Sequence, residues 1–415
     1  MLSKIIRQFK ENIEGLRDFV SLVEPFLQER EKEAIKSERE NLLPLVIALN
    51  ELDDDFEVSP ELKKKIEEKV GTIKTDVNEI ENGKSVNISF EKQNKEFNNA
   101  IEKMVKSNFQ KELLYKSSLM SLCSTAEWFI YQLFHQYYNL FPYPSEHKDK
   151  FFSLDDLKEF NTIDDAKNFL ISTKVDKIMR QGFEEWYQSL KKQDIFGLKM
   201  KEVENYKNEL TEIFQRRHLL VHNGGFVNEF YLQKVDSTLT EGLKKEDKLY
   251  LFKDYIEKAI NTIEFCFLLI AFELWRKLDK ENVDKRSDVI NDFIIDYIEK
   301  ERYENAENLA RFYSCEKGLK EHFALVGQLN YWQSIKWQGR YNEIKVEVEK
   351  ADYTAKDALF KAGYFAICDD KESFFECLEE AINNKKLKVE EAKTWPIFKE
   401  MRKEEKFNDI VGKHE

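Results

Sequence analysis

Two long stretches of this chain, residues 107 to 140 and 252 to 278, are apolar around much of the circumference of an α-helix. Helices of that kind are buried on most sides and form the centre of a bundle. The sequence of 415 residues contains only 13 glycines and 6 prolines, too few for the many turns of a β-sandwich or barrel. We therefore expect an all-α protein that is organised around these two helices.

The length of the chain exceeds one average hydrophobic core and predicts more than one domain. Residues 107–280 are interpreted as a helical bundle. Residues 1–106 are interpreted as an N-terminal helical arm, because charged amphipathic patterns dominate there. In this arm we expect an interruption near Pro25 and a helix start at Ser59-Pro60, where serine can cap the helix and proline suits its first turn.

The C-terminal part, residues 288–415, shows weak self-similarity. Arg302-Tyr303 is echoed by Arg340-Tyr341, and Glu349-Lys350-Ala351 is echoed by Glu380-Ala381. A helix, a turn and a helix with small residues, repeated about every 34 residues, is the tetratricopeptide pattern, which this segment resembles in degenerate form. The resemblance implies a small α-solenoid with a surface for a protein or peptide partner.

Charge, cysteine content and hydropathy narrow the function classes. The net charge of −13 argues against a general nucleic-acid binder with a broad basic face, but it leaves room for a local basic site. The five cysteines form no CxxC pair, so we expect small buried residues of a reduced protein rather than disulfides or metal ligands. The longest apolar run, Phe265 to Phe272, is far shorter than the about 20 residues that span a bilayer, and no signal peptide follows Met1. We expect a cytoplasmic protein without membrane contact.

The densest cluster of reactive side chains is the segment Arg216-Arg217-His218-Leu219-Leu220-Val221-His222-Asn223-Gly224-Gly225. A helical pattern leads into it from Lys201, and the Asn-Gly-Gly run ends the helix because glycine adopts the left-handed conformation that a helix end needs. His222 therefore lies in the last turn, where the helix dipole favours the imidazolium form. Arg217 lies one turn earlier and about 140° around the helix axis.

Two interpretations of this segment give it a structural or a metal-binding role. In the first, the arginines and histidines only cap the helix and form ion pairs. In the second, His218 and His222, four residues apart on one helix face, bind zinc. That site needs a third ligand, which Glu212 or Glu229 would supply only if the fold brought it close, and no HExxH glutamate lies between the histidines.

A third interpretation is metal-free cleavage of a phosphodiester. This reaction needs a base for the 2′-hydroxyl of RNA, an acid for the leaving 5′-oxygen and a cation for the charge of the phosphorane. Histidine titrates in the required range, and arginine binds phosphate bidentately without losing its charge. One chain supplies few of these groups, but a two-fold dimer would bring together two copies of Arg217 and two of His222.

The segment Ile213-Phe214-Gln215-Arg216-Arg217-His218-Leu219-Leu220-Val221-His222-Asn223-Gly224-Gly225 resembles the motif of the HEPN superfamily of helical-bundle ribonucleases. That motif is an arginine, usually a polar residue, three to five further residues and a histidine, as in Arg217 to His222. The longer phrase looks like a subgroup from bacterial phage-defence and abortive-infection loci, which more often has asparagine where this chain has His218. The likeness covers residues 107 to 278.

The resemblance implies a metal-independent endoribonuclease of a bacterial defence or toxin system, without cofactor, that cleaves RNA by 2′-hydroxyl attack across a homodimer interface. Arg217 would bind phosphate and His222 would be the acid and base. His218 would orient phosphate, share a proton or only pack, and Asn223 would bind the His222 ring or cap the helix. Arg216 would contact RNA. The alternative is a non-catalytic dimeric adaptor that binds a protein partner through its C-terminal repeats, which the acidic net charge favours.

Overall fold

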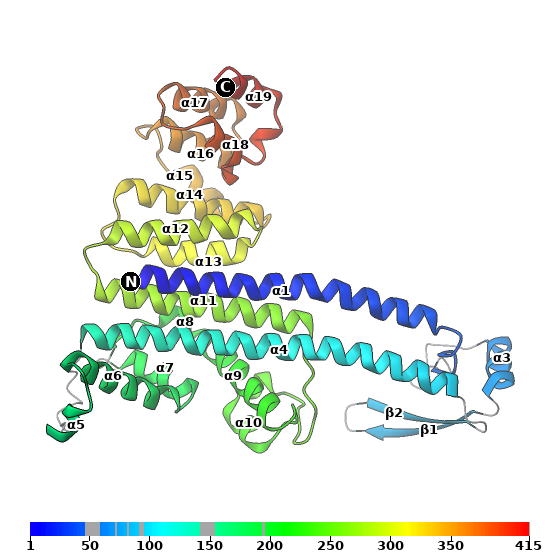
Figure 1. Cartoon of the computed structure of the whole chain (residues 1–415). Helices are drawn as coiled ribbons and strands as arrows, with labels where there is room; N and C mark the ends of the chain where they lie inside the picture. The colour runs from blue at the N-terminus through cyan, green and yellow to red at the C-terminus, as the bar shows by residue number, and fades with distance from the viewer. Residues whose placement is uncertain are drawn as a thin grey trace.

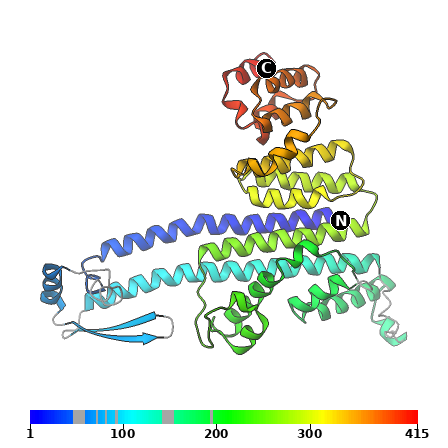
Figure 2. The same cartoon turned by 180° about the vertical axis from the view of Figure 1, so that it is seen from behind.

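The computed structural model describes residues 1–45, 59–70, 73–80, 83–90, 95–141, 154–192 and 196–414. Its body is built on three long helices that run side by side, as both views of the molecule show (Figures 1 and 2). They are α1 (Leu2–Ser37), α4 (Lys95–Leu140) and α11 (Lys253–Leu278). The prediction of two central apolar helices is confirmed, although α4 begins earlier than residue 107.

Aromatic rings hold the three long helices together. Phe9 of α1 stacks on Phe129 of α4 with ring centroids 4.1 Å apart, and it lies 6.2 Å from Phe267 of α11. All three rings are buried, and full burial of a phenylalanine side chain contributes about 1.5–3 kcal/mol. The first helix is thus part of the same hydrophobic core as the two helices that the sequence placed at the centre.

Helix α1 continues through Pro25, so the predicted interruption at this residue is wrong. Proline lacks the N–H of an α-helical hydrogen bond and normally kinks or ends a helix. Here Pro25 is exposed, while Val20, Glu24 and Leu27 on the opposite face are buried against the bundle. Packing on both sides of the proline holds the helix in register.

The described residues between 59 and 90 form a small unit at the far end of α1 and α4 (Figure 1). It consists of α3 (Pro60–Val70) and an antiparallel hairpin of β1 (Ile73–Ile80) and β2 (Gly83–Phe90), in which Val77 pairs with Val86. The predicted helix start is confirmed, since the Ser59 hydroxyl accepts a hydrogen bond of 3.3 Å from the backbone N–H of Leu62. The hairpin was not expected. All other secondary-structure elements that the structure describes are helices, in agreement with the predicted all-α class.

Shorter helices cover one side of α4 and α11. They are α5 (Leu154–Lys158), α6 (Ile163–Met179), α7 (Phe183–Lys191), α8 (Lys201–Glu204), α9 (Lys207–His222) and α10 (Glu229–Lys234). A capping box of Thr162 and Asp165 starts α6. Trp186 of α7 is buried between Phe214 of α9 and Phe267, so this residue belongs to the core.

The C-terminal part continues as a stack of helices above α11 (Figure 1). Its elements are α12 (Val283–Glu299), α13 (Tyr303–Ser314), α14 (Glu321–Trp337), α15 (Tyr341–Lys350), α16 (Ala358–Cys368), α17 (Lys371–Asn383), α18 (Val389–Thr394), two short 3₁₀ turns (Pro396–Phe398 and Met401–Lys403) and α19 (Glu405–Gly412). Helices α12 and α13 share the core of the bundle, and a second core begins on α14. The boundaries 1–106, 107–280 and 288–415 stay predictions.

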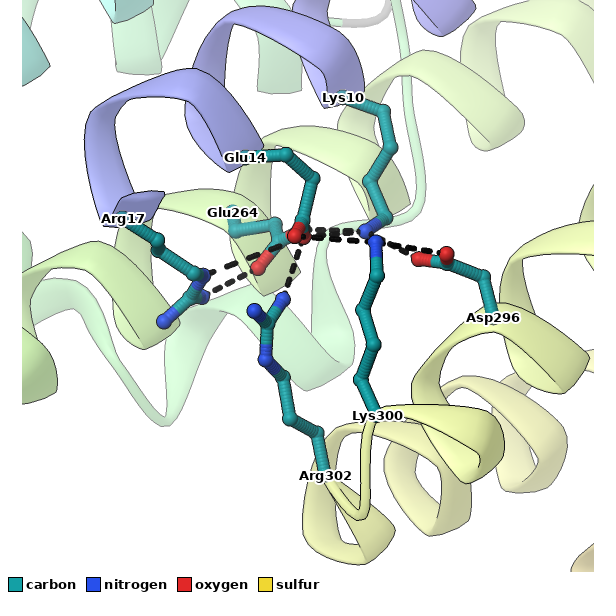
Figure 3. Close-up of polar contacts among 7 residues, drawn as sticks. All are labelled: Lys10, Glu14, Arg17, Glu264, Asp296, Lys300 and Arg302. Atoms are coloured by element: carbon teal, nitrogen blue, oxygen red, sulfur yellow. Dashed lines mark hydrogen bonds and ion pairs between the residues drawn. The ribbon is translucent and has the colours of Figure 1, made fainter. Parts of the chain in front are cut away.

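A group of seven charged side chains joins α1 to α11, α12 and the start of α13 (Figure 3). Its members are Lys10, Glu14, Arg17, Glu264, Asp296, Lys300 and Arg302. Lys10 Nζ lies 2.6 Å from Glu14 Oε1 and 2.8 Å from Asp296 Oδ2. The Glu264 side chain is fully buried and pairs with Arg17. This network fixes the C-terminal helices against the first helix of the chain.

The burial of the cysteines and the hydropathy of the helices bear on two further predictions. All five cysteines are free, and Cys123, Cys266 and Cys377 are buried as expected. Cys315 is exposed, so the expectation of burial is wrong for it, because it follows the last turn of α13 at the surface. No helix among the described residues has the length and apolar character to cross a membrane.

Candidate functional site

The helix that carries the Arg-His motif ends where the sequence predicted. Helix α9 stops at His222, and Leu219 O accepts hydrogen bonds from the backbone N–H groups of Asn223 and Gly225, at 2.8 and 3.0 Å. Gly224 and Gly225 have φ angles of 62° and 88°, in the left-handed region that favours glycine. A side chain on Gly225 would also lie 3.3 Å from Leu220 Cδ2. The tight turn therefore depends on glycine. The expected single helix from Lys201 is divided in two before Lys207.

The two histidines of the motif lie together on the surface. The rings of His218 and His222 are exposed, with centroids 4.6 Å apart and a tilt of 46°. Partial burial, followed by the charges of His222 and Arg217, lowers the pKa of His218 below its usual value. His218 is therefore neutral at pH 7, the form that accepts a proton.

Arg217 faces a carboxylate from another helix. Its Nη2 atom lies 3.6 Å from Oε2 of Glu127 on α4, and the two side chains are 29% and 37% exposed. Burial raises the pKa of Glu127 above its usual range, and the charge of Arg217 offsets part of that effect. Sequence reasoning missed Glu127, because nothing in the motif indicates which residue of α4 lies against α9. The pair is loose and accessible, so the guanidinium is open to exchange for a phosphate.

Arg216 points into the protein. Its Nε atom donates to Glu212 Oε1 at 2.5 Å, and its guanidinium carbon lies 4.1 Å from the centre of the Tyr255 ring. Glu212 also accepts hydrogen bonds of 2.7 Å from the hydroxyls of Tyr231 and Tyr255. With 14% of its side chain exposed, Arg216 has little surface for the RNA contact that the sequence analysis assigned to it. The cluster instead anchors α9 to α10 and α11.

Asn223 stabilises the turn after the motif. Its side-chain amide donates a hydrogen bond of 2.5 Å to Phe226 O, and its backbone carbonyl accepts one of 3.0 Å from Phe226 N–H. Both contacts are made with Phe226 in the turn, whereas the helix end itself is capped by the backbone N–H of Asn223, which donates to Leu219 O. These contacts hold His222 at a fixed place on the rim of the turn.

Residues 223–251 form a small lobe against the end of α9. Phe226 pairs with Lys248 in an isolated β-bridge, and Leu219, Val227, Tyr231, Val235 and Leu249 make a separate apolar cluster. The lobe contains α10 and a 3₁₀ turn, Ser237–Leu239. Large apolar side chains are exposed on the lobe and on the neighbouring helices: Trp128, Val221, Phe226, Phe230 and Tyr250. Such exposure beside a polar site is typical of a contact surface.

The zinc interpretation finds no third ligand in the part of the chain that the structure describes. No three His, Cys, Asp or Glu side chains there gather closely enough to hold a metal ion. Glu212, one of the two glutamates considered, is committed to Arg216, Tyr231 and Tyr255. The other, Glu229, pairs with Lys245 at 3.1 Å.

Comparison with known proteins adds no assignment: no protein-family model, curated protein or solved structure matches the chain. The HEPN and tetratricopeptide resemblances therefore depend on the residues quoted above.

Proposed function

We propose that the chain is a metal-independent endoribonuclease whose active site forms where two copies of the end of α9 meet in a homodimer. The observation that carries the proposal is the exposed His218–His222 pair in the last turn of α9, with the half-exposed Arg217 in the same helix. Proton acceptors, a proton donor and a fixed cation are what cleavage of RNA needs. The resemblance to phage-defence proteins suggests that the enzyme serves a bacterial defence or toxin system.

The proposed reaction is transfer of the phosphodiester to the adjacent 2′-oxygen. A neutral histidine takes the proton of the 2′-hydroxyl, and the oxygen attacks phosphorus. A second, protonated histidine gives its proton to the 5′-oxygen as the bond from phosphorus to that oxygen breaks. The products are a 2′,3′-cyclic phosphate and a 5′-hydroxyl, and the net proton count does not change.

Arg217 stabilises the negative charge that develops on the non-bridging oxygens of the phosphorane. Arginine suits this task because its planar guanidinium donates two parallel hydrogen bonds and stays charged. In the free chain Glu127 lies 3.6 Å away and must give up this contact when phosphate binds. His222 is the principal acid and base, and His218 assists as a neutral neighbour.

The dimer is part of the proposal because one helix end has one Arg217 and one His222. A two-fold axis near the motif would place a second His222 and a second Arg217 at the same phosphate. The exposed apolar side chains beside the motif, among them Val221 and Phe230, are suited to bury surface in such a contact. We place Arg216 outside the reaction, in the support of α9.

The experiment is RNA cleavage in EDTA by the wild type, by Arg217→Ala and by His222→Ala. Arg39→Ala and His414→Ala are the matched controls, since both residues are exposed and lie outside the motif. We expect both motif variants to lose at least about a hundredfold in rate, because an acid–base group such as His222 and a charge-stabilising group such as Arg217 each contribute about that much, while both controls keep full activity. Mapping of the cut ends tests for the cyclic phosphate.

Two further measurements separate the proposal from the adaptor alternative. The mass of the active species in solution should be twice the 49.6 kDa of one chain. Expression of the wild type should slow growth, and His222→Ala should relieve the effect. An active species of single-chain mass would contradict the shared site. A dimer in which wild type and both variants are equally inactive would favour the adaptor.

A further inference from the structure

A second site lies away from the motif, in a cavity of about 420 Å³ between α8, α11 and α13. It is lined on one side by α8 and α11 of the bundle and on the other by α13 of the C-terminal part. The volume is within the range of about 300–1,000 Å³ that small-molecule sites occupy. None of its lining residues belongs to the Arg-His motif.

The lining is basic in a protein that is acidic as a whole. Four cations, Lys199, Lys201, Arg276 and Arg311, face two carboxylates, those of Glu202 and Glu273. The chain has a net charge of −13, so a local excess of two positive charges is unlike its average surface. A cavity of about 490 Å³ along α1 and α11 has the opposite balance, with five carboxylates against three cations. A third cavity, of about 480 Å³ between α1 and α4, is also basic, with three cations against one carboxylate, but no aromatic ring lines it.

Several of these cations are available to a ligand. Lys199 and Lys201 are exposed and have no ion-pair partner among the residues that the structure describes. Arg311 pairs with Glu307, and 57% of its side chain remains exposed. Arg276 is held in place by Glu273 and Glu316, each at 2.8 Å. Burial raises the pKa of Glu273, and the charge of Arg276 offsets part of that effect.

Aromatic rings form the apolar part of the same cavity. The half-buried rings of Tyr206 and Phe265 meet edge to face with centroids 5.5 Å apart. Phe312 lies beneath the guanidinium of Arg276 at 4.9 Å. Aromatic faces stack on nucleobases, and lysine and arginine bind phosphate, so one lining offers partners for both halves of a nucleotide.

We propose that this cavity binds a nucleoside polyphosphate, with the base against Tyr206 and Phe265 and the phosphates on Lys199, Lys201 and Arg311. The site is separate from the Arg-His motif and does not depend on the nuclease activity. It touches the residues that connect α8 to α9 and also α13, so an occupied cavity contacts both the bundle and the C-terminal helices.

Cys315 provides a direct probe, because it lines the cavity and is exposed, whereas Cys123, Cys266 and Cys377 are buried. The rate at which a maleimide labels Cys315 is followed by peptide mass spectrometry, with and without ATP, on the full-length protein. At an ATP concentration about ten times its dissociation constant, labelling should slow about tenfold. Cys368, which lies outside the cavity, reports any general effect of ATP on the protein or the reagent.

The variant is Lys199→Glu combined with Lys201→Glu, and the matched control is Lys345→Glu combined with Lys350→Glu on α15. All four lysines are exposed, so both double variants should fold as the wild type does, which circular dichroism checks. Loss of two phosphate contacts should weaken the affinity for ATP at least about tenfold, and only in the cavity variant. Tyr206→Ala should weaken the affinity for ATP but leave the affinity for pyrophosphate unchanged.

Adenosine and pyrophosphate, tested separately, distinguish the two halves of the ligand. Protection of Cys315 by ATP in the wild type and in the α15 control, lost in the cavity variant, supports the site. No protection in the wild type, or equal protection in both double variants, overturns it. Protection by pyrophosphate as strong as that by ATP overturns the assignment to a nucleotide, because the rings would then contribute nothing.

Discussion

Removal of the Glu14 charge should uncouple the C-terminal helices from α1. Burial by itself would raise the pKa of Glu14, but hydrogen bonds and charge from Arg302 and Lys10 outweigh burial and lower it from 4.5 to about 2. At about 1.4 kcal/mol per pH unit, the pairing is worth about 3 kcal/mol at neutral pH. The side chain is only 14% exposed, so solvent screening reduces this value little. Glu14→Gln would also leave Lys10, Lys300 and Arg302 with one carboxylate fewer.

The assay is urea unfolding of Glu14→Gln and of Glu11→Gln, an exposed position three residues earlier in α1. Because the pKa of Glu14 is lower in the folded protein than in the unfolded chain, its contribution is complete above pH 4.5 and is lost as the pH falls toward 2. We expect the two variants to differ by about 3 kcal/mol at pH 7 and by about half of that at pH 3. Equal stability at pH 7, or a difference that does not change with pH, would refute the reasoning.

Four smaller changes test the site and its turn. His218→Asn should keep most of the nuclease activity. It should also be more stable than the wild type below about pH 6.5, because the pKa of His218 is lower in the folded protein and the unfolded chain therefore binds the proton first. Thermal melts at pH 7.5 and 5.5 measure this difference in stability. Glu127→Gln should lower KM for RNA several-fold with little change in kcat, since it removes a competitor of phosphate for Arg217, and an unchanged KM would contradict that role. Gly225→Ala should destabilise the protein by about 1–2 kcal/mol, because its φ is 88°, whereas Gly15→Ala, in an open position of α1, should stabilise it by about 0.5–1 kcal/mol.

The parts of the fold that sequence reasoning predicted are those with a long, regular signal. Helix α11 matches the expected 252 to 278 almost to the residue, because its apolar pattern persists over seven turns. The end of α9 was predictable for a different reason: glycine adopts the left-handed conformation of Gly224 and Gly225 more readily than other residues do, so two adjacent glycines indicate a turn by themselves. In both cases the decisive information is local.

The errors come from tertiary effects and from a pattern that was passed over. Pro25 lies inside α1 because the buried face of that helix is continuous with the bundle, and packing outweighed the lost hydrogen bond. The hairpin at residues 73–90 had a signal in the alternation of Ile73, Thr75 and Val77 and of Val86, Ile88 and Phe90. The charged composition around this segment led to a helical interpretation instead.

The candidate site also has residues that the sequence indicates and residues that only the fold reveals. Arg217, His218 and His222 could be assigned from one contiguous motif, and the structure places the two histidine rings side by side. Glu127 could not, because it is 90 residues away from Arg217 in the chain and only the packing of α4 on α9 joins them. The inward direction of Arg216 was also hidden: Glu212 lies four residues earlier on the same helix, but Tyr255 becomes a neighbour of Arg216 only when α9 meets α11.

The Arg217–Glu127 pair bears on whether the proposed site can work at all. Two half-exposed charges 3.6 Å apart contribute at most about 1 kcal/mol, and salt screens part of that. A phosphate that accepts two parallel hydrogen bonds from the guanidinium binds more strongly than such a pair. Arg216, which is paired and stacked inside the bundle, could not make this exchange without breaking a buried network. Of the two adjacent arginines, Arg217 is therefore the one whose charge is available to RNA, and the difference follows from burial rather than from residue type.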